Sequence, residues 1–391
     1  MQFRIRRSSP ELVFFAPDVA DHVTATRAEA FRDYGYSLTT FGFRRDRYSR
    51  TGGLGGDCIL LGQTQEGRYV HRILALLKAL PKLFQNRHAI RGARIFYARN
   101  IDQLFLALLS CVLARRRPRV VYEVLDVQPA FTGNGVLSRL LRSAERWALR
   151  RVDMLVLSSP GFLKHYYRPV QRYSRPWFLL ENKLPPAFSG LERPAEIAVP
   201  QRRRRSGGTR WVVAYCGVIR GQQTFDLIVR LAERLQGIVE FRFHGLVTTV
   251  DLPGFHEASR RLPNLVYAGP YLAARDLPAI YRSVDFAWGL DLENSEHNSR
   301  WLLPCRLYEA GFFGVPCLTA AGFEVGERVE DSRIGWSFEL PYERSLYDFF
   351  LNLDDAEYEE KRRRLLDMPE SSFVGGEDAM ELCRLIDGRK A

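Results

Sequence analysis

Short apolar runs alternate with amphipathic segments along the whole chain. In the first half, strand-like runs cover residues 12–16, 36–43, 94–98, 120–124 and 154–158. Helix-like segments lie between them, at residues 25–34, 102–114 and 136–151. Strands that alternate with helices are typical of a parallel sheet with crossover helices. The pattern therefore predicts an α/β domain in the first half.

The alternation stops near residue 191 and starts again at residue 211. The intervening ERPAEIAVPQRRRRSGGT has the proline, glycine and charge of a linker. After it, strands are predicted at residues 211–216, 239–245, 264–269, 285–289 and 316–319, with helices at 224–235 and 277–283. We therefore expect two doubly wound domains, 1–188 and 211–370, joined by a linker at 189–210.

The chain of 391 residues is basic, with 57 Lys and Arg against 45 Asp and Glu, a net charge of +12. Arginine forks match phosphate oxygens, so nucleotide diphosphates, lipid pyrophosphates, anionic membranes and nucleic acid are all compatible partners. The sequence has no aromatic RNA-binding platform and no helix-turn-helix signature. A basic nucleic-acid-binding protein is therefore the disfavoured alternative, and we expect no nucleic-acid partner.

Six cysteines are far apart and form no C-x-x-C pair, which predicts free, buried thiols in a reducing compartment. The N-terminus has no apolar region followed by a cleavage site, and the most apolar run, residues 104–114, is shorter than the roughly 20 residues that span a bilayer. We expect a cytoplasmic protein that can lie peripherally on the inner face of the cell membrane.

The segment NSRWLLPCRLYEAGFFGVPCL, residues 298–318, carries the most specific pattern. Pro304 precedes a short helix with Arg306 and Glu309, and Gly314 and Pro316 end that helix before a buried strand. The segment resembles the sugar-nucleotide-binding element of GT-B glycosyltransferases, above all the retaining family-4 type. In that family the glutamate of a P-x-[KR]-x-x-E run hydrogen-bonds the ribose of the donor. The alternative is an ordinary amphipathic helix with a surface glutamate.

The resemblance implies the GT-B fold, in which two Rossmann-like domains face a cleft. It also implies that a helix within residues 371–391 returns to the N-terminal domain. The N-terminal domain would then bind the acceptor, and the C-terminal domain would bind a UDP- or GDP-linked sugar. No essential metal or other cofactor is implied.

A glycine turn, Gly217 to Gly221, follows a buried strand and precedes a helix. Glycines allow close backbone approach, helix-start N–H groups favour an anion, and Arg220 adds positive charge. The resemblance assigns Arg220 and Gly217 to the leaving diphosphate, with Arg306 in support. It also places Gly245 at the next strand end and Tyr271 near the base, with an aromatic that fills a domain edge as the alternative for Tyr271.

The sequence departs from the family at one position. Family-4 enzymes often have two glutamates separated by seven residues, but the first position is Trp301 here. Asn298, Ser299 or backbone groups are the candidates to contact the sugar instead. We interpret Asp291 and Glu293 as structural carboxylates and not as a metal-binding pair.

Polar residues at strand ends mark the acceptor half. Arg99, Asn100 and Asp102 follow one predicted strand, and Asp126 follows the next. By the same resemblance, Asp126 is the candidate base or ligand of the acceptor hydroxyl, with helix N-capping as the alternative. Glu123 is expected to pair with an arginine. The proposed catalytic set is Asp126, Arg220 and Glu309.

Residues 69–84 form a basic amphipathic segment whose apolar face comprises Ile73, Leu76, Leu77, Leu80 and Phe84. Such a face either lies on anionic lipid or packs inside its own domain. A membrane-facing first domain would suit a polyprenyl-diphosphate-linked acceptor.

The resulting hypothesis is transfer of a sugar from a nucleoside-diphosphate donor to a saccharide or lipid-linked acceptor, with retention, in bacterial exopolysaccharide, capsule or lipopolysaccharide synthesis. The alternative on the same fold is a sugar-nucleotide epimerase.

Overall fold

The computed structural model describes residues 11–45, 57–64, 69–194, 209–248, 252–293 and 295–388. The chain divides into two compact units. Unit 1 is Met1–Leu180 together with Gly376–Ala391, and unit 2 is Glu181–Gly375. Most of the predicted linker, including its arginine run, lies outside the described residues.

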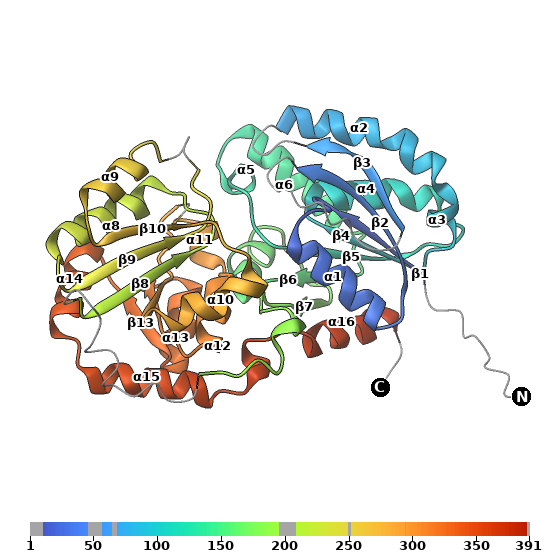
Figure 1. The fold of residues 1–391 in the computed structure, drawn as a ribbon. Coiled ribbons are helices and arrows are strands. Elements are labelled where there is room, and N and C mark those ends of the chain that lie inside the picture. The colour runs from blue at the N-terminus through green and yellow to red at the C-terminus, as the bar shows by residue number, and fades with distance from the viewer. Residues whose placement is uncertain are drawn as a thin grey trace, which may run out of the picture. The chain divides into compact units, whose positions relative to one another are not determined.

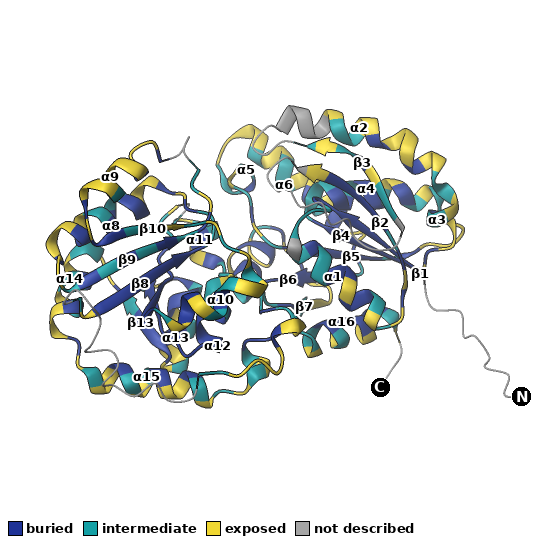
Figure 2. Ribbon diagram, in the orientation of Figure 1, coloured by how far each residue is buried: buried dark blue, intermediate teal, exposed yellow. Residues whose placement is uncertain are grey.

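Unit 1 contains a seven-stranded parallel sheet of order β3-β2-β1-β4-β5-β6-β7 (Figure 1). The strands are β1 (Glu11–Ala16), β2 (Ser37–Arg45), β3 (Asp57–Thr64), β4 (Ile95–Arg99), β5 (Arg119–Val124), β6 (Met154–Leu157) and β7 (Trp177–Leu179). The apolar residues of β1, β2, β4, β5 and β6 are buried on both faces, as expected for strands that helices cover on either side, whereas the edge strands β3 and β7 expose Leu60 and Trp177. Figure 2 shows the inner strands as the buried centre of the unit.

The helices of unit 1 lie on the two faces of this sheet. They are α1 (His22–Asp33), α2 (Tyr69–Gln85), α3 (Arg87–Arg91), α4 (Ile101–Ser110), α5 (Pro129–Thr132), α6 (Val136–Leu149), α7 (Pro160–Phe162) and α16 (Glu377–Asp387), with a 3-10 turn at Cys111–Leu113 and a π-helical turn at Leu163–Tyr167. Because the chain moves along the sheet in opposite directions before and after β3, right-handed crossovers place α1 on one face and α2, α4 and α6 on the other.

The C-terminal helix α16 completes the core of unit 1 beside α1. Leu382, Cys383 and Ile386 are buried in this core. The Tyr36 hydroxyl donates to the Cys383 carbonyl at 3.0 Å, and Arg119 Nη1 donates to the Leu385 carbonyl at 2.8 Å. Residues at the two ends of the chain therefore belong to one folded body.

Unit 2 contains a six-stranded parallel sheet of order β10-β9-β8-β11-β12-β13. The strands are β8 (Trp211–Cys216), β9 (Val239–His244), β10 (Leu265–Gly269), β11 (Phe286–Trp288), β12 (Cys317–Ala320) and β13 (Gly335–Phe338). The helices are α8 (Gln222–Arg234), α9 (Phe255–Arg261), α10 (Ala273–Arg282), α11 (Asn298–Trp301), α12 (Cys305–Phe312), α13 (Glu324–Ser332), α14 (Tyr342–Asn352) and α15 (Asp355–Asp367), with 3-10 turns at Pro186–Phe188 and Glu370–Ser372.

The two parallel sheets confirm the α/β fold class. The strands expected from the apolar runs are present, whereas β3, β7 and β13 were not predicted. Three of the six free cysteines are buried, but Cys58 and Cys111 are half-buried and Cys305 is exposed, so the prediction of buried thiols was too broad. Within the described ranges, no helix is long and apolar enough to cross a membrane.

Candidate functional site

Backbone hydrogen bonds connect the carboxyl ends of β8, β9 and β10 at one edge of the unit 2 sheet. The N–H of Gly217 donates to the His244 carbonyl at 3.0 Å, and the N–H of Gly245 donates to the Gly269 carbonyl at 2.9 Å. Gly217 and Gly245 have φ angles of 125° and 146°. A Cβ at Gly245 would lie 1.7 Å from the Gly217 carbonyl oxygen, so only glycine allows this packing.

Arg306 borders the glycine turn from α12. Its Nη1 donates to the Trp288 carbonyl at 2.9 Å, and its guanidinium lies over the Tyr215 ring at 4.5 Å. A Cβ built on Gly217 would be 3.7 Å from Arg306 Nη2. Arg306 is therefore a fixed positive charge beside the turn.

Arg220 lies in the turn itself and is exposed. Within the described part of the chain, its side chain has no hydrogen bond or ion pair. Gly221 occupies the N-cap position of α8 with φ 88°, so the helix begins directly after Arg220. The turn therefore combines an accessible guanidinium with the N-terminus of a 13-residue helix, an arrangement that favours an anion.

Glu293 packs against the same helix start. A Cβ at Gly221 would lie 3.1 Å from Glu293 Oε2, and the N–H of Leu292 donates to Thr224 Oγ1 at 3.1 Å. No sequence pattern predicted this carboxylate next to the glycine turn.

Glu309 projects from α12 and is half-buried. The hydroxyl of the buried Tyr281 donates to Glu309 Oε2 at 3.2 Å. Burial raises the pKa of Tyr271, and the charge of Glu309 raises it further. The same two causes raise the pKa of Cys216 to about 12. Glu309 is therefore close to both Tyr271 and the strand end that leads into the glycine turn.

The two remaining donor-side candidates, Asn298 and Pro304, lie in the segment that leads into α12. Asn298 begins α11 and is half-buried. Pro304 is at the N-cap position of α12, and its carbonyl accepts from the Leu307 N–H at 3.0 Å. Gly314, with φ 70°, follows the end of that helix as the sequence predicted.

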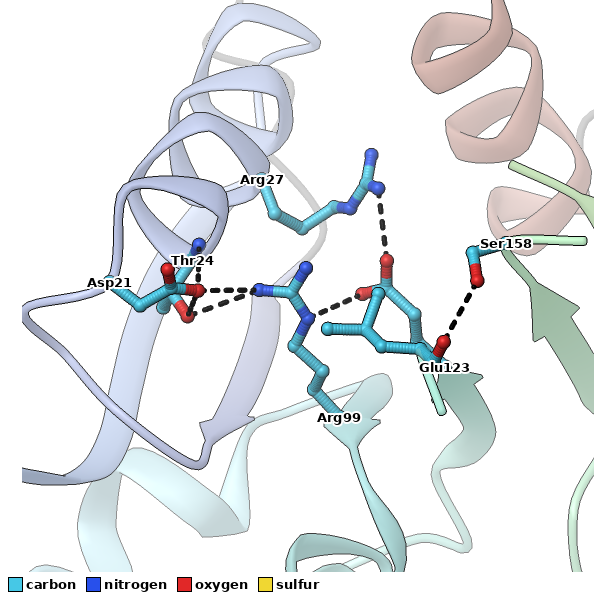
Figure 3. A network of polar contacts seen from close by, with 7 residues as sticks. Asp21, Thr24, Arg27, Arg99, Glu123 and Ser158 are labelled. Carbon is cyan, nitrogen blue, oxygen red and sulfur yellow. Dashed lines mark hydrogen bonds and ion pairs between the residues drawn. The ribbon is translucent and has the colours of Figure 1, made fainter. Parts of the chain in front are cut away.

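A buried network of charges organises the strand ends of unit 1 (Figure 3). Arg27 Nη2 lies 2.9 Å from Glu123 Oε1, and Arg99 lies 3.6 Å from Glu123 Oε2 and 3.4 Å from Asp21 Oδ2. Burial alone would raise the pKa of Glu123, but the charges of Arg27 and Arg99 outweigh it and hold the pKa below its usual value. The expected pairing of Glu123 with an arginine is confirmed.

This network changes our interpretation of Arg99. Its side chain is fully buried and extends toward α1, so it contributes to the core and not to a ligand surface. Sequence alone could not show whether Arg99 points into the core or toward a ligand surface, because successive side chains of a strand point to opposite faces.

Asn100 and Asp126 line one small pocket in unit 1, while Asp102 lies half-buried in the first turn of α4. Asn100 has φ 71° and ψ 158°, a conformation that non-glycine residues rarely adopt and that is frequent at functional sites. Asp126 is exposed. Gln128, not Asp126, is at the N-cap position of α5, so the capping alternative for Asp126 was wrong.

Glu145, on α6, also lines this pocket and was missed from the sequence. It is 3% exposed and accepts hydrogen bonds from the Tyr166 hydroxyl at 2.5 Å, the Tyr167 hydroxyl at 3.1 Å and Gln171 Nε2 at 2.6 Å. Burial raises the pKa of Glu145 to about 7, although these three donors oppose the shift. The signal that could have identified Glu145 from the sequence is its place on the buried face of α6, which it shares with Ala148 and Leu149.

Comparison with known proteins finds one relative in sequence and several relatives in fold. No family model matches it. The succinoglycan biosynthesis protein ExoL of Rhizobium meliloti (strain 1021) is 29% identical over 329 residues, which cover 83% of this chain and 80% of that protein.

Solved structures with the same fold cover nearly the whole chain. Sucrose-phosphate synthase from Thermosynechococcus elongatus has a TM-score of 0.72 at 12% identity, with 96% of this chain and 98% of that chain covered. Anabaena HepE in complex with UDP has a TM-score of 0.66 at 13% identity, with 97% and 100% covered. The glycosyltransferase WaaG, involved in lipopolysaccharide biosynthesis, has a TM-score of 0.63 at 15% identity, with 97% and 100% covered.

These similarities match the two parallel-sheet units described above and confirm the resemblance stated from the sequence. The chain therefore has the GT-B fold of glycosyltransferases.

Proposed function

We propose that this protein is a glycosyltransferase of bacterial surface polysaccharide synthesis. It transfers one sugar from a UDP- or GDP-linked donor to a saccharide or a polyprenyl-diphosphate-linked acceptor, with retention. One observation carries the proposal: the glycine turn, Arg220, Arg306 and Glu309 belong to one sheet edge of unit 2. The similarity to ExoL and to HepE, which was solved with UDP, supports it.

In this proposal each side chain has a distinct task. Arg220 and the first N–H groups of α8 stabilise the negative charge that develops on the leaving diphosphate. Arg306, held by the Trp288 carbonyl, adds a second fixed positive charge. Glu309, oriented by Tyr281, accepts hydrogen bonds from the ribose hydroxyls. Asp126 faces the acceptor hydroxyl as base or ligand.

A thermal-shift screen against UDP-, GDP- and other activated sugars tests donor binding, followed by product analysis with and without acceptor. Stabilisation by one nucleotide sugar and transfer to an acceptor support the proposal. A rearranged donor formed without acceptor would instead identify an epimerase. Salt-sensitive retention of nucleic acid, with no response to any sugar nucleotide, would exclude both enzymes.

The membrane part of the proposal rests on the outer surface of α2, α4 and α6. Large apolar side chains on these helices and on the adjoining 3-10 turn are exposed: Leu74, Leu77, Leu80, Phe84, Leu109, Val112, Val136, Leu137, Leu140 and Trp147. For the sequence-predicted face of α2, Leu77 and Phe84 are both 57% exposed, which favours lipid over internal packing. The side chain of Ile73 lies outside the described residues.

The charge of this layer favours an anionic bilayer over a second copy of the chain. Asp102 is the only acidic residue in 69–118, and the exposed cations there include Lys78, Lys82 and Arg115–Arg117. Two copies of such a surface would repel each other, whereas acidic lipids attract it.

Co-sedimentation with vesicles tests this surface. The full chain should bind phosphatidylcholine vesicles that contain phosphatidylglycerol and leave neutral vesicles unbound. Phe84→Glu combined with Leu77→Glu should abolish binding, whereas the matched control Leu351→Glu, at an exposed leucine of unit 2, should retain it. Equal binding of both variants would exclude the assignment.

A further inference from the structure

Glu293 is an exposed carboxylate at the start of α8, the place to which the proposed function assigns the leaving diphosphate. A Cβ at Gly221 would lie 3.1 Å from Glu293 Oε2 and 3.5 Å from the Cβ of Glu293. Gly221 is the N-cap residue of this helix. A negative charge of the protein itself therefore lies at a position that favours an external anion.

The backbone of the surrounding loop fixes Glu293 in this place. The N–H of Leu292 donates to Oγ1 of the buried Thr224 at 3.1 Å, which connects the loop to the first turn of α8. The N–H of Glu293 donates to Asp291 Oδ1 at 3.1 Å, and its carbonyl accepts a hydrogen bond from the Ser299 hydroxyl. Because the main chain is held on both sides, the carboxylate can leave the helix start only by rotation of its own side chain.

The carboxylate lies near the helix donors without being bonded to them. Within the described part of the chain, it accepts no hydrogen bond and forms no ion pair, not even with Arg220 in the same turn. The N–H groups of residues 222–224 have no acceptor inside the helix, and no described side chain caps them. A more highly charged anion can therefore displace Glu293 from this position.

Glu293 opposes any anion that binds at this helix start. Two like unit charges about 4 Å apart in water weaken each other's binding about fivefold. An inorganic anion has only its charge with which to overcome this repulsion. A nucleoside diphosphate also gains the contact of its ribose with Glu309 that the proposed function assigns. The repulsion therefore reduces the affinity for the nucleotide without preventing its binding.

We propose that Glu293 is a built-in competitor of the diphosphate. Its carboxylate occupies the start of α8 before the donor binds, rotates away when the diphosphate arrives, and returns as the nucleoside diphosphate product leaves. The inference rests on the proposed function for the identity of the diphosphate. Glu293 determines how tightly the nucleotide product is held, and it takes no part in bond making or breaking.

Calorimetric titration of the full chain with UDP and GDP tests the proposal. Glu293→Gln keeps the size of the side chain and removes its charge, so at low ionic strength the Kd of the bound nucleotide should fall about fivefold. An unchanged or higher Kd overturns the proposal. The melting temperature of the variant serves as its folding control.

Glu296→Gln is the matched control, because Glu296 is an exposed carboxylate of the same loop. It removes the same charge without touching the contact at Gly221, and it should change the Kd by less than about twofold. Equal tightening by the two variants overturns the proposal, since net charge and not the position of Glu293 would then determine the affinity.

Ionic strength provides a readout that a purely structural role of Glu293 would not change. Salt screens the repulsion between exposed charges, with a Debye length of about 3 Å at 1 M. The difference in nucleotide affinity between wild type and Glu293→Gln should therefore nearly disappear in about 1 M NaCl. A difference that stays the same at high salt overturns the proposal.

Fragments of the nucleotide show which part Glu293 opposes. Uridine lacks the diphosphate, so wild type and Glu293→Gln should bind it equally, whereas inorganic pyrophosphate should bind the variant more tightly. Tighter binding of uridine by the variant overturns the proposal. Weaker UDP binding by the variant that appears only with added Mg²⁺ would identify Glu293 as a metal ligand and would also overturn it.

The outcomes separate this inference from the proposed function. If the wild type binds neither UDP nor GDP while Glu293→Gln binds pyrophosphate about fivefold more tightly than the wild type, the proposed function fails and the competitor role stands. If the wild type transfers sugar and Glu293→Gln has an unchanged inhibition constant for the nucleotide product, the competitor role fails and the proposed function stands.

Discussion

The carboxyl edges of the two sheets are built alike in backbone and differently in side chains. In unit 2, glycines open the strand ends and two arginines supply positive charge. In unit 1, the pocket is lined by the carboxylates of Glu145 and Asp126 together with phenol groups. Parallel sheets offer the same crevice beyond their strand ends, and the side chains placed there select the ligand. One architecture, used twice in the chain, therefore carries positive charge at the strand ends of one unit and carboxylates at those of the other.

The largest effect is expected from removing the backbone feature that shapes the unit 2 edge. Gly245→Ala places a Cβ 1.7 Å from the Gly217 carbonyl oxygen at φ 146°. We expect a loss of more than about 3 kcal/mol in the free energy of unfolding, since backbone must move. Urea unfolding measures the loss. Gly254→Ala, where a Cβ would meet no atom within 4 Å, is the control.

A pH series of unfolding measurements tests whether Glu145 is a buried, ionisable carboxyl group in unit 1. Glu145 has a folded-state pKa of about 7 against an ordinary value of 4.5. Between these values the folded chain holds a proton that the unfolded chain has lost. The contribution of Glu145 to stability is therefore greatest below pH 4.5 and is lost as the pH rises from 4.5 through 7, a change of about 3 kcal/mol at most. The difference in unfolding free energy between wild type and Glu145→Gln, measured at pH 5 and pH 8, should change by this amount. A constant difference would contradict the burial of an ionisable carboxyl at this site.

Arg220→Ala tests whether the unit 2 edge acts on the leaving diphosphate. Loss of a charge that matters most in the transition state should lower kcat about 100-fold, with little change in donor KM. Steady-state kinetics with saturating acceptor measures both values. Arg230→Ala is the matched control, because Arg230 is an exposed α8 arginine paired with Glu343. Equal kcat values for the two variants would remove Arg220 from the site.

Glu309→Gln should have the smallest effect, on donor binding. Replacing a charged acceptor by a neutral one costs about 1.4 kcal/mol, or tenfold in the Kd for UDP. Isothermal titration calorimetry measures it, with the exposed α15 variant Glu360→Gln as control. An unaltered Kd would show that Glu309 does not contact the nucleotide.

The sequence predicted the parts of the fold that depend on local pattern. Buried runs located β8 and β9, and the order of the glycine turn and the P-x-R-x-x-E helix indicated the GT-B layout. The missed strands β3 and β13 are edge strands that begin next to glycine or polar residues, so their apolar signal is weak.

The candidate site was harder to predict, because side-chain direction and distant partners decide it. Arg99 and Asn100 are adjacent in sequence, yet one is buried among charges and the other lines a pocket. Glu145 reads as an ordinary helical glutamate until Tyr166, Tyr167 and Gln171 are seen around it. These contacts depend on the tertiary structure and leave little trace in local sequence.

The position of α16 has a consequence for how the chain is made. Leu382 and Cys383 are fully buried in unit 1, whose first strand begins at Glu11. During synthesis, the ribosome must finish all of unit 2 before this helix emerges. Unit 1 is therefore still incomplete, with part of its core uncovered, when all residues of unit 2 have already been synthesised. Unit 2 can mature first, reversing the usual order in which domains fold as they leave the ribosome.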